Sequence, residues 1–290
     1  MNPVELSCPD RGWLTGPESV AAQGDPFIPR CIPLAISTKR LAGLIAVTFG
    51  AGDVHAIETL SFSASKDAAI YNNATSNANG AGVSFLAGNN GSGQTRRGLI
   101  RFDLSSIVPG STVESVRLEL YVDQSPNATA RAISLHPIRE SWTEGSTDPG
   151  GLQGQGAAGS AGDVTWSSRS LPSLAWTTPG GTFGSASASA SVTGVGWYAW
   201  EATSSMNVAM LEDIQNWIDA PATNAGWMIV GVESGTSTVK RFVSSEGDPA
   251  FAPKLTLTVV PVPEPETYAL FAAGLVLLGV AARRRPRTSV

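Results

Sequence analysis

The sequence predicts an all-β domain, an antiparallel, jelly-roll-like β-sandwich with one short helix. Apolar and polar side chains alternate along residues 116–123, which is the pattern of a strand with one buried face. A second alternating segment covers residues 254–259. The other strand candidates are short and are separated by clusters of Gly, Pro, Asn and Ser, an arrangement typical of a sandwich and unlike alternating βαβ units.

The predicted elements follow one another from residue 60 to residue 259. The strands are expected at 60–63, 99–104, 116–123, 133–138, 197–202, 227–232, 239–244 and 254–259. The glycine-rich segment 145–162 is predicted to be a long surface loop, because so many glycines weaken a strand. Segment 184–196, rich in Ser and Ala, is either another loop or a weak edge strand.

One helix is predicted between the strands at 197–202 and 227–232. Ser204 or Ser205 is expected to cap its first turn, and Pro221 to end it. A short helix of this kind is expected to lie across an edge of the sandwich. Its apolar stripe recurs at helical spacing and consists of Val208, Leu211, Ile214, Trp217 and Ile218.

Four segments are predicted along the chain: an extended leader at 1–36, a signal peptide at 37–56, the β domain at 57–260 and a sorting segment at 261–290. The signal peptide has a basic start at Lys39 and Arg40, an apolar centre, and small residues that fit cleavage after Ala56. The leader does not fit a signal peptide, so either it is unusually long or translation begins later.

Export is also consistent with the cysteines. Both of them, Cys8 and Cys31, lie in the leader. The exported domain is therefore expected to have no disulfide, no thiol nucleophile and no thiolate metal site, and its stability must come from core burial.

The C-terminal segment combines a spacer, an apolar run and a cationic end. Pro263, Glu264 and Pro265 precede an uncharged run at 268–282, and Arg283, Arg284 and Arg285 follow it. A helix without a polar face is typical of a membrane-spanning helix, and arginines act as a stop-transfer signal. At about 1.5 Å per residue the run is only about 22 Å long, whereas the hydrocarbon core is roughly 30 Å thick. We therefore expect a transmembrane sorting helix that anchors the chain temporarily.

These three parts, in this order, resemble the PEP-CTERM sorting signal of Gram-negative bacteria. The resemblance implies transient anchoring in the inner membrane, processing by an exosortase-like enzyme near Pro263, Glu264 and Pro265, and transfer to the cell surface or the extracellular matrix. The logic is similar to that of a GPI signal, whose hydrophobic tail is also removed.

The body of the chain resembles the DNRLRE domain, a carbohydrate-binding-module-like β-sandwich. The resemblance depends on the order and spacing of several segments. These are residues 96–105, 113–122, 141–145, 165–166, 176–181, 226–227, 244–246 and 253–255, together with Thr203 and Trp217. Two departures concern ligand specificity and not the fold: Glu201-Ala202-Thr203 replaces the usual Asp-Val-Thr, and the hexapeptide that names the family is absent.

A sugar-binding site requires aromatic rings that stack on sugars and planar polar groups that bind hydroxyls. The candidate rings are Trp166, Trp176 and Tyr198, whereas Trp217 and Trp227 are expected in the core. Arg97 and Arg101 share one strand face and can bind hydroxyls or a uronate; the alternative is a structural ion pair, for example with Glu144 or Glu246.

The sequence gives only weak indications of nucleic-acid binding, metal binding or catalysis. The net charge of −5 disfavours nucleic acid. No metal site is predicted, although Asp67 is a weak candidate for a structural Ca²⁺ site; its alternative is a turn cap. Only His136 is available for a catalytic triad, and no Gly-x-Ser-x-Gly motif is present.

The favoured interpretation is an exported, non-catalytic protein that binds polysaccharide at the cell surface or in the biofilm matrix. Two alternatives stay open. One is a structural or adhesive surface protein that binds no sugar. The other is a polysaccharide hydrolase or lyase that uses a carboxylate pair such as Glu140 and Glu144.

Overall fold

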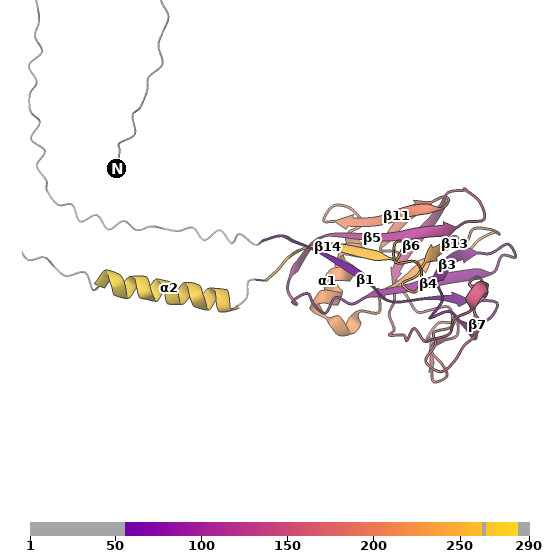
Figure 1. Cartoon of the computed structure of the whole chain (residues 1–290), viewed down its shortest axis with the longest axis horizontal. Helices are drawn as coiled ribbons and strands as arrows, with labels where there is room; N and C mark the ends of the chain where they lie inside the picture. Colours follow the sequence, from indigo (N-terminus) through magenta and orange to yellow (C-terminus); the bar gives the residue numbers. More distant parts are fainter. Residues whose placement is uncertain (1–55, 263–264, 284–290) are drawn as a thin grey trace, which may run out of the picture. The chain divides into compact units, whose positions relative to one another are not determined.

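The computed structural model describes residues 56–262 and 265–283 (Figure 1). The predicted leader and nearly all of the predicted signal peptide lie outside the described residues. So do Pro263, Glu264, Arg284 and Arg285, which were predicted to belong to the sorting signal.

The described part of the chain is mostly β structure. Its strands are β1 (Glu58–Tyr71), β2 (Asn77–Ala78), β3 (Ser84–Asn89), β4 (Thr95–Phe102), β5 (Thr112–Gln124), β6 (Arg131–Pro137), β7 (Ala157–Ala158), β8 (Ser168–Ser170), β9 (Leu174–Ala175), β10 (Ala188–Val192), β11 (Gly196–Thr203), β12 (Trp227–Val230), β13 (Lys240–Val243) and β14 (Lys254–Val260). Its helices are α1 (Val208–Asp219) and α2 (Pro265–Arg283), with short 3₁₀ turns η1 (Gly150–Leu152) and η2 (Pro221–Thr223).

Two antiparallel sheets form the domain. In sheet A, β14 lies between β1 and β5, β11 pairs with the other edge of β5, and β13 joins β5 to β3. In sheet B, β4 pairs with β1 and β3, and β12, β6 and β10 follow. Strands β1 and β3 belong to both sheets, so β1, β14, β5, β13, β3 and β4 close into a six-stranded barrel.

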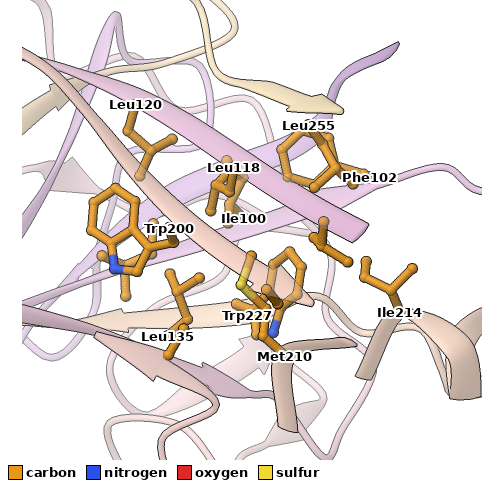
Figure 2. Packing of buried hydrophobic residues seen from close by; sticks show 14 of the residues in the cluster. Ile100, Phe102, Leu118, Leu120, Leu135, Trp200, Met210, Ile214, Trp227 and Leu255 are labelled. Atoms are coloured by element: carbon orange, nitrogen blue, oxygen red, sulfur yellow. The ribbon is translucent and has the colours of Figure 1, made fainter. Parts of the chain in front are cut away.

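The core lies between the inner faces of the two sheets. Figure 2 shows Trp200 from β11 and Trp227 from β12 entering this core from different sheets. The indole Nε1 of Trp200 donates a hydrogen bond to the carbonyl oxygen of Ile133 in β6, 2.9 Å away. Since a buried N–H without a partner costs stability, this bond allows a large ring to fill the centre of the core.

Sheet B is buried on its outer face as well. A second apolar cluster lies there, and it includes Ile70, Leu99 and Met228 from the sheet. The segment between β6 and β10 covers them with Trp142 and Trp176. The predicted surface loop 145–162 lies within this segment and contains η1 and β7. Most of its residues are exposed, and the carbonyl oxygens of Gln153 and Gly154 accept hydrogen bonds from Tyr71 and Arg96. On the outer face of sheet A, in contrast, side chains such as Arg117 and Trp197 are exposed.

Helix α1 packs Met210, Ile214, Trp217 and Ile218 against the main core. Three of these residues belong to the predicted stripe; of its other two, Leu211 is partly buried and Val208 is 41% exposed. It ends before Pro221, as expected, because proline cannot continue the hydrogen-bonded turn. The predicted serine cap is wrong. The N-cap is Asn207, which has φ 49° and makes no side-chain capping bond. Asparagine adopts this left-handed conformation more readily than most residues.

A helix is present in the C-terminal segment, as predicted, but its transmembrane character is not confirmed. In α2, side chains such as Leu270, Leu275 and Leu278 are exposed. Within residues 56–262 and 265–283, we find no helix that combines the length and the apolar character needed to span a bilayer. The apolar run 268–282 is about 22 Å long as a helix, which is shorter than the hydrocarbon core of roughly 30 Å.

The predicted all-β, antiparallel class is confirmed, whereas the jelly-roll arrangement is not. All eight predicted strands have counterparts in the structure. Strand β3 was missed, because all six of its residues are buried and its sequence therefore shows no polar–apolar alternation. Segment 184–196 contains β10, the edge strand of sheet B.

Candidate functional site

The two predicted arginines lie on the outer face of sheet B. Arg97 and Arg101 flank Leu99 on β4, so the predicted shared strand face is correct. The guanidinium of Arg97 donates to both carboxylate oxygens of Glu233, at 2.6 and 2.8 Å, and to the carbonyl oxygen of Gly180 at 2.7 Å. With these partners, Arg97 acts as a structural cross-link between β4 and two loops.

Trp166 completes the surroundings of Arg97. The Arg97 guanidinium lies 4.9 Å from the centre of the Trp166 ring, a cation–π arrangement. Gly180 has φ +89°, and a Cβ there would lie 2.7 Å from atoms of both Arg97 and Trp166. One face of the indole is therefore occupied by the protein itself, and the rest is only partly exposed.

The remaining predicted residues are also engaged in internal contacts. Trp176 is only 4% exposed, and its Nε1 donates to the carbonyl oxygen of Thr165 at 3.0 Å. Burial of the ring in the outer cluster of sheet B argues against a stacking role. The Nε of Arg101 donates to the carbonyl oxygen of Asn224 at 2.9 Å. The structure thus places Arg97 and Trp166 together but keeps Trp176 inside.

Tyr198 points inward from β11 and supports the turn that follows β10. Its hydroxyl accepts a hydrogen bond from the backbone N–H of Thr193 and donates to the carbonyl oxygen of Gly194, each at 3.1 Å. Buried Lys240 holds the same turn from the other side, because its ammonium donates to the carbonyl oxygen of Thr193. These contacts fix the start of β11, where Trp197 is located.

Asp67, the weak calcium candidate, is buried in a group of carboxylates. Its Oδ2 accepts hydrogen bonds from the backbone N–H and the hydroxyl of Ser245, both at 2.8 Å, and its own N–H donates to Glu144 at 2.6 Å. Burial and the nearby charge of Glu246 raise the pKa of Asp67 to about 8, although the Ser245 bonds oppose the shift. Among the described residues, no group of three His, Cys, Asp or Glu side chains is arranged to hold a metal ion.

Three aromatic residues of the β domain, one exposed and two half-buried, lie together instead on the outer face of sheet A. Tyr121 on β5 and Trp197 on β11 are direct cross-strand partners, and Phe251 lies against both rings. We call these three residues the aromatic patch. Trp197 is 46% exposed, which is unusual for a tryptophan, because this residue type is mostly buried.

A groove of about 520 Å³ lies beside Trp197. Its other walls are Ser63, Glu119, Lys254 and the segment 249–253. Three of these side chains form one row across neighbouring strands. Lys254 on β14 is the register partner of Ser63 on β1 and of Glu119 on β5. The groove thus combines an open indole with a hydroxyl, an ammonium and a carboxylate, which are the groups that orient polar ligands.

A second hollow, of about 570 Å³, lies between α1 and the segment that follows β6. Two of its carboxylates already have partners. Asp213 accepts hydrogen bonds from Ser187 and from the Trp227 indole, and Asp219 accepts from the backbone of Gly110. No exposed ring lines this hollow, since its one tryptophan, Trp217, is only 6% exposed, so the patch on sheet A is the better candidate site.

The alternation along residues 116–123 predicts that Tyr121 lies on the polar face of its strand, whereas Trp197 and Phe251 were not among the predicted site residues. Within β11, alternation places Trp197 and Glu201 on one face and Trp200 on the other. The acidic Glu201 indicates which face is exposed, so this pattern was the available signal. Phe251 lies in a loop, and no local pattern indicates its position.

Comparison with known proteins agrees with two of the resemblances in outline. Residues 58–148 match carbohydrate-binding module family 96. Residues 261–285 match the PEP-CTERM protein-sorting motif. A search of curated proteins returned no match. The first match includes Ser63, Glu119 and Tyr121 but ends before Trp197; the narrower DNRLRE assignment stays a prediction. Together the two matches support a surface protein that carries a carbohydrate-binding-like domain and an export signal.

Proposed function

We propose that the chain is an exported, non-catalytic cell-surface or matrix protein whose β domain binds a glycan at the aromatic patch. The observation that carries the proposal is the exposed indole of Trp197 beside the groove lined by Glu119 and Lys254. Aromatic rings bind the apolar C–H faces of sugars, and neighbouring polar groups bind the hydroxyls. The match to a carbohydrate-binding module supports this chemistry.

The absence of a catalytic role is part of this proposal and is supported by the local contacts. His136 is the one histidine among the described residues, and its ring nitrogens lie 2.9 Å from the Gly184 carbonyl oxygen and 3.2 Å from the Ser134 hydroxyl. Glu140 accepts bonds from Thr177, and Glu144 from Asp67. These residues therefore have structural partners that compete with roles in proton transfer.

The sorting part of the proposal follows from the C-terminal motif. The PEP-CTERM match implies export and delivery to the cell surface of a Gram-negative bacterium. We assign the transient inner-membrane stage to the apolar helix α2 and the processing step to an exosortase-like enzyme acting near Pro263, Glu264 and Pro265. The polysaccharide ligand would then be part of the surface or of the surrounding exopolysaccharide.

A glycan array with the purified full chain tests the proposed function. We expect binding to at least one class of glycan, and we expect Trp197→Ala to weaken it at least tenfold, because one exposed ring supplies the stacking surface. Trp166→Ala is the matched control: it removes an indole from the other sheet and is expected to leave affinity within about twofold once folding is verified by circular dichroism.

Failure to bind across neutral and acidic glycans would reject the proposal. The alternative of a structural or adhesive protein would then gain support if the chain self-associates in analytical ultracentrifugation. Equal loss of affinity in both tryptophan variants would place the site elsewhere.

A further inference from the structure

The three rings of the aromatic patch form a compact cluster and not a line. Their centres are separated by 4.2 Å for Tyr121 and Phe251, 5.3 Å for Tyr121 and Trp197, and 6.3 Å for Trp197 and Phe251. The corresponding interplanar angles are 27°, 66° and 42°. Rings at such angles cannot lie on one flat surface together.

Only one of the three rings offers a large open area. Tyr121 and Phe251 stack on each other, so each covers part of its neighbour, and both are half-buried. Trp197 contacts Tyr121 by an edge and is 46% exposed. A pyranose ring is about as wide as an indole, so the patch provides a single stacking position, with Tyr121 and Phe251 supporting the Trp197 ring.

The polar groups of the groove lie close to this single position. Glu119 is followed two residues later on β5 by Tyr121, and Tyr121 is the cross-strand partner of Trp197. The cross-strand partner of Glu119 on β11 is Ala199, whose short side chain leaves room between Trp197 and Glu201. A sugar ring on the indole is thus within reach of Glu119 and of the Lys254 ammonium in the neighbouring strand.

Ion pairs occupy the outer face on both sides of the patch. Arg117 pairs with Glu119 and Glu201 on one side, and Arg241 pairs with Asp123 on the other, through two bonds of 2.8 and 2.9 Å. All five side chains are partly or largely exposed to water. Covering them with a solid surface would remove that water, and the desolvation of paired charges is costly.

We infer that the patch takes one sugar residue of a soluble, hydrated glycan chain and does not bind the flat face of a crystalline polysaccharide. This inference depends on the proposed function of the patch. Contact with a crystal face needs several coplanar rings in a row with little charge between them. A single chain in the groove contacts Glu119 but leaves Arg117, Glu201 and the Arg241–Asp123 pair in water.

The experiment compares soluble and crystalline forms of the same sugars. The full chain is titrated calorimetrically with cello-, chito- and uronate oligosaccharides, and depletion from solution is measured with crystalline cellulose and chitin. We expect one-to-one binding to one soluble series and no depletion by crystalline cellulose or chitin above that seen with Trp197→Ala. Trp197→Phe keeps a ring and is expected to retain more affinity than Trp197→Ala.

The outcomes separate the inference from the proposed function. Strong depletion by a crystalline form that is lost in Trp197→Ala would overturn the inference and leave the proposed function intact. Binding at more than one equivalent sugar position per chain, again dependent on Trp197, would overturn the inference in the same way. No binding to either form, or binding insensitive to Trp197→Ala, would reject the proposed function itself.

Discussion

Two arginines on different faces of the domain illustrate how surroundings decide the contribution of a charged residue. Arg97 is only 16% exposed, bonds to both oxygens of Glu233 and stacks on Trp166. Arg117 is 44% exposed and pairs with Glu119 and Glu201 in water. Exposed ion pairs contribute little because hydration competes with them, whereas a partly buried pair leaves a desolvated partner when it is broken.

We therefore expect Arg97→Ala to lower the free energy of unfolding by about 3 kcal/mol. The substitution removes the bonds to the Glu233 carboxylate and to the Gly180 carbonyl oxygen, and it leaves the Glu233 charge without its partner. Arg117→Ala is the control and is expected to cost less than about 1 kcal/mol. Urea denaturation of the two variants measures the difference. Equal losses would show that Arg97 is not the cross-link that its contacts indicate.

Asp67 makes the stability of the domain depend on pH. Burial, followed by the charges of Glu246 and Glu144, raises its pKa to about 8, and burial raises the pKa of Glu144 to about 7. A carboxyl whose pKa is raised on folding binds more protons in the folded state than in the unfolded state between its two pKa values. The free energy of unfolding must then fall as pH increases.

We expect this decrease between about pH 4, near the pKa of an unfolded aspartate, and about pH 8. Asp67→Asn is expected to flatten the profile, because an amide carries no proton to lose. Thermal unfolding at a series of pH values provides the measurement, with Glu58→Gln at the exposed start of β1 as the control. A profile that is unchanged in Asp67→Asn would contradict the assignment.

At the level of elements, local patterns identified strands well and contacts between distant segments poorly. The alternation in β5 correctly placed Arg117, Glu119 and Tyr121 on one face, because side-chain direction in a strand follows from the chain itself. Which face is covered depends on other segments. The layer between β6 and β10 buries Trp176, and no local signal in the sequence indicates that this layer packs on sheet B.

The same limitation explains the candidate site. Tyr121 and Trp197 are far apart in sequence and meet through the register of β5 and β11, and Phe251 reaches them from a loop. Register depends on long-range packing, so the patch was not predictable from the composition of either strand. The structural ion pair that stayed open as the alternative for Arg97 is present, but its partner is Glu233 and not Glu144 or Glu246. Glu233 lies in a loop distant in sequence, so no local pattern indicates it.

The covering layer of sheet B gives a prediction at this scale. Trp176→Ala is expected to lower the free energy of unfolding by about 3–5 kcal/mol, because it leaves a cavity in the outer cluster. It should also speed cleavage by proteinases within the glycine-rich segment 145–162, since it removes the bond from the Trp176 indole to Thr165, three residues after this segment. Limited proteolysis followed by mass spectrometry detects the cleavage.

The control for the layer is Leu174→Ala, two residues away and exposed. It is expected to change stability by less than about 0.5 kcal/mol, as is usual for surface positions. If Trp176→Ala unfolds the whole chain without earlier cleavage in 145–162, the layer and the barrel form one cooperative unit and the separate opening proposed here is wrong.

For the whole molecule, the C-terminal segment decides where the domain is displayed. If an exosortase-like enzyme processes the chain, protein at the cell surface is expected to lack α2. The variant Glu264→Ala is expected to keep α2 and to accumulate in the membrane fraction. Intact mass spectrometry of surface and membrane fractions gives the lengths. Asp248→Ala, in the domain, is the control; full-length chain at the surface would contradict processing.

The position of β14 has a mechanical consequence for a domain held by its C-terminal end. This strand leads directly into the sorting segment and lies between β1 and β5, paired with both along most of its length. If a glycan is bound beside Lys254 while the chain is held beyond Val260, the two attachments load opposite ends of β14. Tension then acts along the strand and strains both ladders of hydrogen bonds in shear, so the bonds share the load and do not open one after another.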